Sequence, residues 1–488
     1  MPFNKLGAGV AAAALLAGVA QAETLRDAFA RTYTGNPTLT AERARLRGTD
    51  EGVAIARAEG LPQIGADVGF TQQFGNTTAG AGGSLGGGTG RVVTVGPSLT
   101  MPLFSGGKVR NGIKAADARV NAGRADLRTV EGDVFTDVVG AYMDVLRDEA
   151  IVALNQGNVK VLETNLQASK DRFSVGDLTR TDVAQSEARL AVAHSDLANA
   201  MGKLTGSREN YRRLVGVFPD KLDQPPVLPA LPATPEDSVD IALANNPALA
   251  SIAAQRKAAS YDVGVARAGR LPQVSAIAGT SYNNYLGTAN KFFGLGSAIP
   301  VENSFTTSQI GVTARIPLYQ GGGVAARVRQ ARAAESQTIE QSVEVERQVV
   351  ANTRAAYASY VAANETIASS ESAVAANRLA LEGVRAENTV GTRDVLDVLN
   401  AEQELLNSEV TLVTAQRDAY VAGFALLNAM GRVNASELGL DGGALYDPTV
   451  NYKQMRSSLS DWRDGPAPKP VATPTTGGNT SAVTPPAN

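Results

Sequence analysis

Few residues in this chain of 488 amino acids have the types and spacing that catalysis or metal binding requires. Its only histidine is His194, and it contains no cysteine. Because neither a second histidine nor a thiolate accompanies His194, this residue lacks the companions of a metal site. No pairing of a nucleophile with a general base is recognisable either. The sequence therefore predicts no enzymatic activity, no metal and no cofactor.

A glycine-rich stretch at Gly82–Gly88 has a composition that can cradle phosphate groups. No Lys-Ser/Thr pair and no helix start follow it, however, as a phosphate-binding loop would require. The stretch joins two segments in which apolar residues alternate, so we interpret it as the flexible tip of a β-hairpin. The formal net charge of −3 gives no electrostatic footprint for nucleic acid.

The elements that would position any functional residue are organised around a motif that occurs twice, at Met101–Gly107 and Ile316–Gly322. Apolar residues recur at every second position before each copy and at steps of three and four after it, so the period changes from strand to helix. Proline cannot donate to a sheet ladder, and paired glycines permit a sharp bend. The strand positions are Val93, Val95, Leu99, Met101 and Leu103, and then Ile310, Val312, Ala314, Ile316 and Leu318. The predicted strand-to-helix junction residues are Pro102, Gly106, Gly107, Pro317, Gly321 and Gly322.

Other landmarks repeat in the same order and at nearly constant spacing. Asn36-Pro37 returns as Asn246-Pro247, and Tyr142 returns as Tyr357. A constant register over several landmarks indicates a tandem duplication. Between Gly107 and about Ser174 there is no proline, which predicts a helix of about 100 Å that runs to a turn and back.

The ends and the middle of the chain suggest its domain organisation. Lys5, an apolar run and Ala20-Gln21-Ala22 form the pattern of a secretory signal peptide. Prolines crowd the stretch 218–235, which indicates a linker. We therefore expect a signal peptide at 1–22, a first repeat at 23–217, the linker at 218–235, a second repeat at 236–440, and a C-terminal segment at 441–488 that ends in a disordered tail.

An exported chain without a helical membrane anchor is soluble in the periplasm, secreted, or part of a β-barrel. Each repeat offers two alternating strands of about ten residues, long enough to cross a bilayer. Four strands cannot close a barrel, and an open sheet edge in lipid leaves backbone groups unsatisfied. Three chains would supply twelve strands and a ring of twelve helical segments. The predicted fold class is thus an α+β membrane protein, in which several chains pool their strands into one β-barrel that continues into a hollow tube of helices.

The motifs resemble those of the TolC family of trimeric outer-membrane export channels. The likeness runs from Glu23 to about Leu440 and lies in both junctions and in two helical turns. The turns are Phe173–Gly176 with Thr181–Val183, and Val390–Arg393 with Val395–Asn400. The resemblance implies a trimeric twelve-stranded β-barrel in the outer membrane, continued by a long periplasmic α-helical barrel. It also implies docking to a periplasmic membrane-fusion adaptor and an inner-membrane ABC or RND transporter.

The resemblance also implies roles at the periplasmic end of the tunnel. Asp397 and Asn400 match two family carboxylates that ring the narrowest point, so a trimer of this chain would place three carboxylates there instead of six. We therefore expect cations to block this channel more weakly than its relatives, and we expect Asn400→Asp to strengthen the block by divalent cations. Arg393 matches an arginine that links to an aspartate, here Asp182 with Thr181 beside it. Asn388 replaces a tyrosine that helps to hold the closed state.

Plainer interpretations stay open. A helical aspartate such as Asp397 is commonly just solvated, and Arg393 with Asp182 could be a surface pair that contributes about 0 to 1 kcal/mol. The leading hypothesis for the whole chain is a passive export conduit for proteins (type I secretion) or small molecules (efflux). The alternatives are a periplasmic adaptor and a structural coiled-coil protein or adhesin of the cell envelope, which would not need the four strands.

Overall fold

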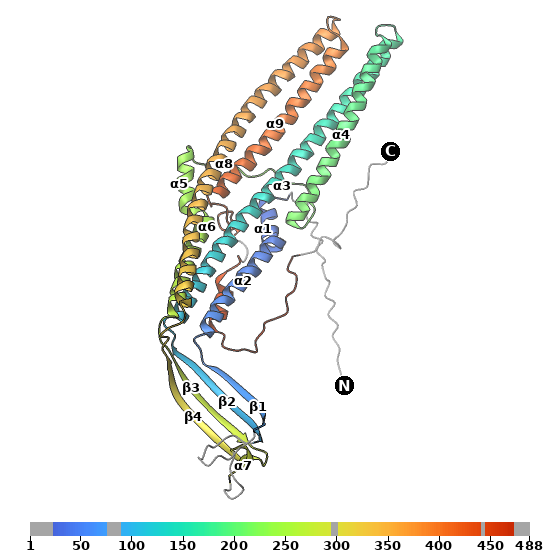
Figure 1. The fold of residues 1–488 in the computed structure, drawn as a ribbon. Coiled ribbons are helices and arrows are strands. Elements are labelled where there is room, and N and C mark those ends of the chain that lie inside the picture. The colour runs from blue at the N-terminus through green and yellow to red at the C-terminus, as the bar shows by residue number, and fades with distance from the viewer. Residues whose placement is uncertain (1–22, 76–88, 294–300, 441–444, 473–488) are drawn as a thin grey trace, which may run out of the picture.

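The structure is a computed structural model, and it describes residues 23–75, 89–293, 301–440 and 445–472. The proposed signal peptide 1–22, the glycine-rich stretch 82–88 and the end of the tail, 473–488, lie outside the described residues. The molecule is elongated, with a four-stranded sheet at one end and two long helical hairpins at the other (Figure 1). Shorter helices pack beside the long ones between these ends.

The sheet has the strand order β1-β2-β3-β4, and every neighbouring pair is antiparallel. The strands are β1 (Gln63–Gln73), β2 (Gly90–Phe104), β3 (Gln273–Asn284) and β4 (Ser304–Arg315). The central β2–β3 ladder joins the first repeat to the second. Within the chain, β1 and β4 have one strand neighbour each, so both outer edges of the sheet offer unpaired backbone groups to another chain.

The fourth strand is shorter than its residue pattern predicts. We expected Ile316 and Leu318 to continue it, but β4 ends at Arg315. Its partner explains the difference, because Arg315 pairs with the first residue of β3, Gln273, and the preceding Pro272 has no N–H to extend the ladder. The first copy differs because Pro102 lies opposite Ser275, and a register shift follows it.

At the first junction the backbone turns from strand to helix through two glycines with positive φ, Gly106 (+63°) and Gly107 (+85°). A Cβ atom on Gly106 would lie 2.7 Å from the Cβ atom of Leu271 and 2.8 Å from the carbonyl oxygen of Ala268. Only glycine fits both this conformation and this close approach. Gly321 and Gly322 have φ values of +59° and +76° at the second junction.

The two repeats contain matching helices. After the junctions come α3 (Lys108–Ser174) and α8 (Gly323–Thr389), each of 67 residues, or about 100 Å at the rise of an α-helix. They return as α4 (Arg180–Val215) and α9 (Val395–Ala429). The shorter helices are α1 (Leu25–Gly35), α2 (Pro37–Ala58), α5 (Pro235–Asn245), α6 (Pro247–Ala268), α7 (Ala289–Phe292) and α10 (Thr449–Ser457).

The predicted break at each Asn-Pro pair is confirmed. The Asn36 side chain accepts hydrogen bonds from the backbone N–H groups of Thr38 and Leu39, and it thereby caps α2. Asn246 caps α6 in the same way. Each following proline is the first residue of its helix, where a missing N–H costs nothing. No helix in the described part of the chain is long and apolar enough to cross a membrane.

The largest hydrophobic core lies midway along the helical part, where α1, α3, α4 and α9 meet. Phe29 makes an edge-on contact with Phe135 and stacks on Phe424, with ring centroids 5.1 Å and 5.9 Å apart. Beyond this core, the buried positions of α3 are largely alanine and valine. Small side chains let long helices lie close together without a wide interior, so aromatic residues are few in so long a molecule.

The repeated tyrosines hold the linker between the repeats. The hydroxyl of the fully buried Tyr142 lies 2.7 Å from the carbonyl oxygen of Asp223 and 2.9 Å from that of Glu23, and its single hydrogen is shared between these two acceptors. Tyr357 donates to the carbonyl oxygen of Ala233 at 2.5 Å. Burial raises the pKa of the Tyr142 hydroxyl, so it remains a donor throughout the physiological range.

Tyr142→Phe is therefore expected to lower stability by about 1–3 kcal/mol, because it leaves the Asp223 carbonyl oxygen without this donor and the Glu23 carbonyl oxygen with only the Asp223 backbone N–H, at 3.1 Å. Thermal unfolding of the detergent-solubilised protein, followed by circular dichroism, measures the effect. Tyr357→Phe is the matched control and should lower the midpoint less, since its hydrogen bond is exposed to water. Equal effects of the two substitutions would contradict this account.

Candidate functional site

The sheet has one apolar face that is open to its surroundings and one polar face. Among the apolar side chains, Ile310 is 90% exposed, Val68 is 77% exposed and Ile64 is 75% exposed. All three lie on the same face of the sheet. Ile64 and Val68 pair with Leu99 and Val95, which are four residues apart on β2. Ile310 on β4 pairs with Ala278 on β3, and Ala278 also pairs with Leu99. A continuous exposed apolar surface of this kind marks contact with lipid or with another protein.

The opposite face of the sheet is polar and hollowed. Asp67, Thr94, Ser98, Thr307 and Gln309 are among the residues that line a concavity there. Thr94 donates to the Asn283 side chain at 2.8 Å across the β2–β3 ladder on this face. Apolar residues on one side of every strand and polar residues on the other are the arrangement of a transmembrane β-barrel wall, with lipid outside and water inside.

The turn between α8 and α9, at the far end of the helical hairpins, carries Arg393. Its guanidinium pairs with the carboxylate of Glu387 at 2.9 Å and with that of Asp397 at 3.6 Å. Asn388 donates from its side-chain amide to the carbonyl oxygen of Arg393 at 2.8 Å. The structure thus brings Arg393, Asp397 and Asn388 together within one turn of the chain.

Asp182 belongs to the other turn, where it caps α4. The backbone N–H and the hydroxyl of Thr179 each donate to its carboxylate at 2.8 Å. These two hydrogen bonds hold the pKa of Asp182 below its usual value. Thr181 is exposed beside it. Among the ion pairs of the described residues, Arg393 has Glu387 and Asp397 as partners. A link between Arg393 and Asp182 would therefore have to join two subunits.

Asn400 lies one helical turn after Asp397 on α9, and it is exposed. Its side-chain oxygen accepts a hydrogen bond of 2.7 Å from Arg189, which lies on α4 in the first repeat. The sequence analysis did not single out Arg189. No local pattern marks it, because its partner is 211 residues away along the chain.

Glu402 is a second residue that the sequence analysis missed. Its side chain is 4% exposed, and it accepts hydrogen bonds from the Asn165 amide at 2.9 and 3.0 Å and from the Arg385 guanidinium at 3.0 Å. These contacts tie α9 to α3 and α8. A signal was present in the sequence, because Glu402 follows Leu399 by three residues and precedes Leu406 by four, so a carboxylate occupies a position on the apolar seam of α9.

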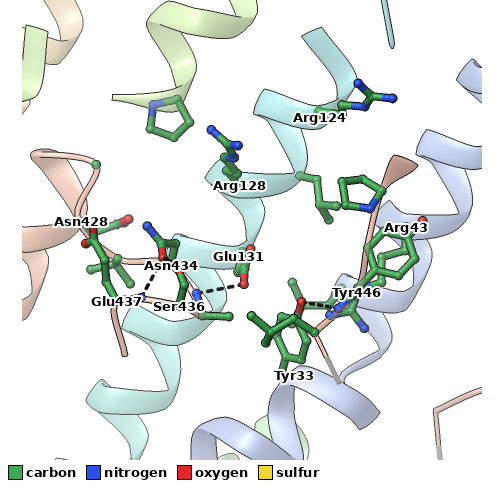
Figure 2. A pocket seen from close by; sticks show the side chains of 18 of the residues that line it. Tyr33, Arg43, Arg124, Arg128, Glu131, Asn428, Asn434, Ser436, Glu437 and Tyr446 are labelled. Atoms are coloured by element: carbon green, nitrogen blue, oxygen red, sulfur yellow. Dashed lines mark hydrogen bonds between the residues drawn. The ribbon is translucent and has the colours of Figure 1, made fainter. Parts of the chain in front are cut away.

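A cavity of about 590 Å³ lies where the C-terminal segment crosses α2 and α3 (Figure 2). The hydroxyl of Tyr33 accepts a hydrogen bond of 3.0 Å from the Tyr446 backbone, and Glu131 accepts one of 3.2 Å from the Ala435 backbone. Burial raises the pKa of the Glu131 carboxyl. Arg43 stacks over the rings of both tyrosines, at 4.3 and 5.1 Å from their centroids. These contacts anchor the C-terminal segment to the helices.

The described residues contain no group of three His, Cys, Asp or Glu side chains that could hold a metal ion. A family model described as "Outer membrane efflux protein" matches residues 31–217 and 239–432, which is most of the chain. The chain belongs to this family.

Individual relatives agree with the family match. The outer membrane efflux protein BepC of Brucella suis is 35% identical over 453 residues, which cover 92% of this chain and 95% of BepC. The outer membrane protein TolC of Escherichia coli is 23% identical over 481 residues and 95% of each chain. The crystal structure of VceC from Vibrio cholerae shares the fold, with a TM-score of 0.70 and 22% identity over 83% of this chain and 96% of VceC.

The fold of this outer membrane efflux protein follows from its family and its sheet. It is a trimeric channel, in which each chain gives four strands to a twelve-stranded barrel in the outer membrane and its helices to a tunnel in the periplasm. The open edges of β1 and β4 are where neighbouring subunits continue the sheet. As an export channel, the efflux protein docks with a periplasmic adaptor and an inner-membrane transporter. Its relatives are channel proteins and not enzymes.

Proposed function

We propose that the channel is a passive exit duct for small molecules, closed at its periplasmic end by the helical turns and opened when the adaptor and transporter dock. It performs no chemistry of its own, and the transporter supplies the energy. The observation that supports efflux is the 35% identity to BepC, a protein named for efflux, over nearly the whole chain. The choice of cargo lies with the transporter, of the ABC or the RND class, that docks to the channel.

Protein secretion is the second candidate cargo. The alkaline protease secretion protein AprF of Pseudomonas aeruginosa is 26% identical over 352 residues, which cover 70% of each chain. Deletion of the gene tests the two candidates. Loss of resistance to several unrelated small toxic compounds, with the set of secreted proteins unchanged, supports efflux, whereas loss of one secreted protein with unchanged resistance supports secretion.

The proposed closure uses residues at the turns. Asp397 and Asn400 form the pore constriction, and Arg393, Asp182, Thr181 and Asn388 hold the turns in the closed arrangement. The pairs of Arg393 with Glu387 and Asp397 support this proposal, because they fix the start of α9 and so the direction in which Asp397 points. Asp182 fixes the start of α4 through its capping bonds with Thr179.

Arg393→Ser and Asp182→Ala are each expected to raise the single-channel conductance several-fold in planar bilayers, because each frees the start of a helix that lines the entrance. Arg378→Ser is the matched control, since Arg378 on α8 pairs with Glu409 on α9 at 3.0 Å but lies away from the turn. Unchanged conductance in both entrance variants, with the control also unchanged, would contradict the proposed closure.

The double variant shows whether Arg393 and Asp182 act as one link between subunits or as two separate supports. If they form one link, the double variant should conduct no more than either single variant, because the second substitution removes nothing further. If each only stabilises its own helix start, the two effects on the conductance should add.

A further inference from the structure

Arg189 carries a positive charge to the level of the proposed constriction. It lies on α4, in the first repeat, and its guanidinium donates to the side-chain oxygen of Asn400 on α9 at 2.7 Å. Within the part of the chain that the structure describes, no carboxylate lies within ion-pairing distance of this guanidinium. A neutral amide therefore orients Arg189 without cancelling its charge.

Several of the neighbouring charges are held in ion pairs. Arg385 pairs with Glu402 at 3.0 Å, and Arg393 pairs with Glu387 at 2.9 Å. Arg393 also reaches Asp397, but only at 3.6 Å, and the Asp397 side chain remains 42% exposed. Nearer the turn, Lys170 on α3 and Glu187 on α4 neutralise each other at 3.1 Å. Asp397 thus keeps only this longer contact with Arg393, and Arg189 has the neutral amide of Asn400 as its partner.

We infer that Arg189 sets the ion selectivity of the periplasmic entrance. The inference rests on the proposed position of Asp397 and Asn400 at the constriction. Asn400 is one helical turn from Asp397, so in the trimer three Arg189 guanidinium groups would stand at the level of the three Asp397 carboxylates and offset part of their negative charge. A ring that mixes positive and negative charges discriminates less between cations and anions than a ring of carboxylates alone, which attracts cations.

This arrangement changes what Asn400→Asp alone should do. The new carboxylate would stand 2.7 Å from the Arg189 guanidinium, and the existing hydrogen bond would become a charge-assisted ion pair. The added negative charge would be neutralised where it arises, so the single substitution should strengthen block by divalent cations little. The block should become strong only when Arg189 is also replaced.

Reversal potentials in planar bilayers with a potassium chloride gradient test the inference on the purified trimer. Arg189→Gln keeps a side-chain donor but removes the charge, and it should raise the permeability ratio of potassium over chloride on the order of threefold. Arg189→Lys retains the charge and should keep the wild-type ratio. Arg208→Gln is the matched control on the same helix, since Arg208 pairs with Glu149 at 2.8 Å far from the turn, and it should also leave the ratio unchanged.

Asp397→Asn separates failure of this inference from failure of the proposed constriction. If Asp397→Asn lowers the preference for potassium but Arg189→Gln leaves the ratio unchanged, Arg189 does not face the ion path and the inference is wrong. If neither substitution changes the ratio, the constriction is not at Asp397 and both proposals fall.

Block by magnesium gives an independent readout. The double variant Arg189→Gln/Asn400→Asp should be blocked at a magnesium concentration several-fold lower than either single variant. Equal block in Asn400→Asp and in the double variant would overturn the inference, because Arg189 would then have no influence on the added carboxylate.

Discussion

Ile310→Arg is expected to abolish assembly of the trimer in the outer membrane. Ile310 lies in the middle of β4 on the apolar face of the sheet, and it is 90% exposed in the single chain. An arginine on the lipid face of a barrel costs about 2–4 kcal/mol near the bilayer midplane, and the trimer carries the substitution three times. Heat-modifiable trimers in outer-membrane fractions, separated by gel electrophoresis, measure assembly.

The neighbouring residue provides the control. Gln309 precedes Ile310 on β4 and lines the polar hollow on the other face, where it pairs with Gly279 in the ladder. Gln309→Arg adds the same charge to the same strand, but its side chain enters water, so the trimer should form at the wild-type level and only the conductance should change. If Gln309→Arg abolishes assembly and Ile310→Arg does not, the two faces of the sheet have been assigned the wrong way round.

Gly96→Ala is expected to destabilise the trimer by about 1–3 kcal/mol per subunit, because it overpacks the central ladder of the sheet. A Cβ atom on Gly96 would lie 2.2 Å from the carbonyl oxygen of Thr280 and 2.9 Å from the Cα atom of Ser281. Backbone atoms cannot rotate away as a side chain can, so β2 and β3 would have to separate where the two repeats join.

The thermal midpoint of trimer dissociation in detergent measures this effect. Gly69→Ala on β1 is the matched control, because nothing lies within 4 Å of the Cβ atom it would add. Its midpoint should equal that of the wild type, whereas the midpoint of Gly96→Ala should fall by several degrees. Equal midpoints for both variants would show that β2 and β3 can separate locally at little cost.

Local patterns along the chain were sufficient to predict most of the elements. The spacing of apolar residues, which changes from every second position to steps of three and four, predicted where β2 ends and where α3 and α8 begin. Each Asn-Pro pair located a helix boundary, because the asparagine side chain caps the helix that the proline begins. The predicted β4 continued through Leu318, whereas the strand ends at Arg315. The length of a strand depends on its neighbour, and Arg315 already pairs with Gln273, the first residue of β3.

By itself, the sequence determined the duplicated plan, the alternation of apolar and polar residues along the strands, and hence the need for more strands than one chain contains. Each of these follows from spacing within short segments. Only the tertiary structure decided which distant side chains meet, such as Arg189 with Asn400 and Tyr33 with the backbone of Tyr446. Their partners lie 211 and 413 residues away, and no local period records how two helical hairpins pack against each other. The contact on which the proposed role of Arg189 rests therefore depends on the packing of α4 beside α9.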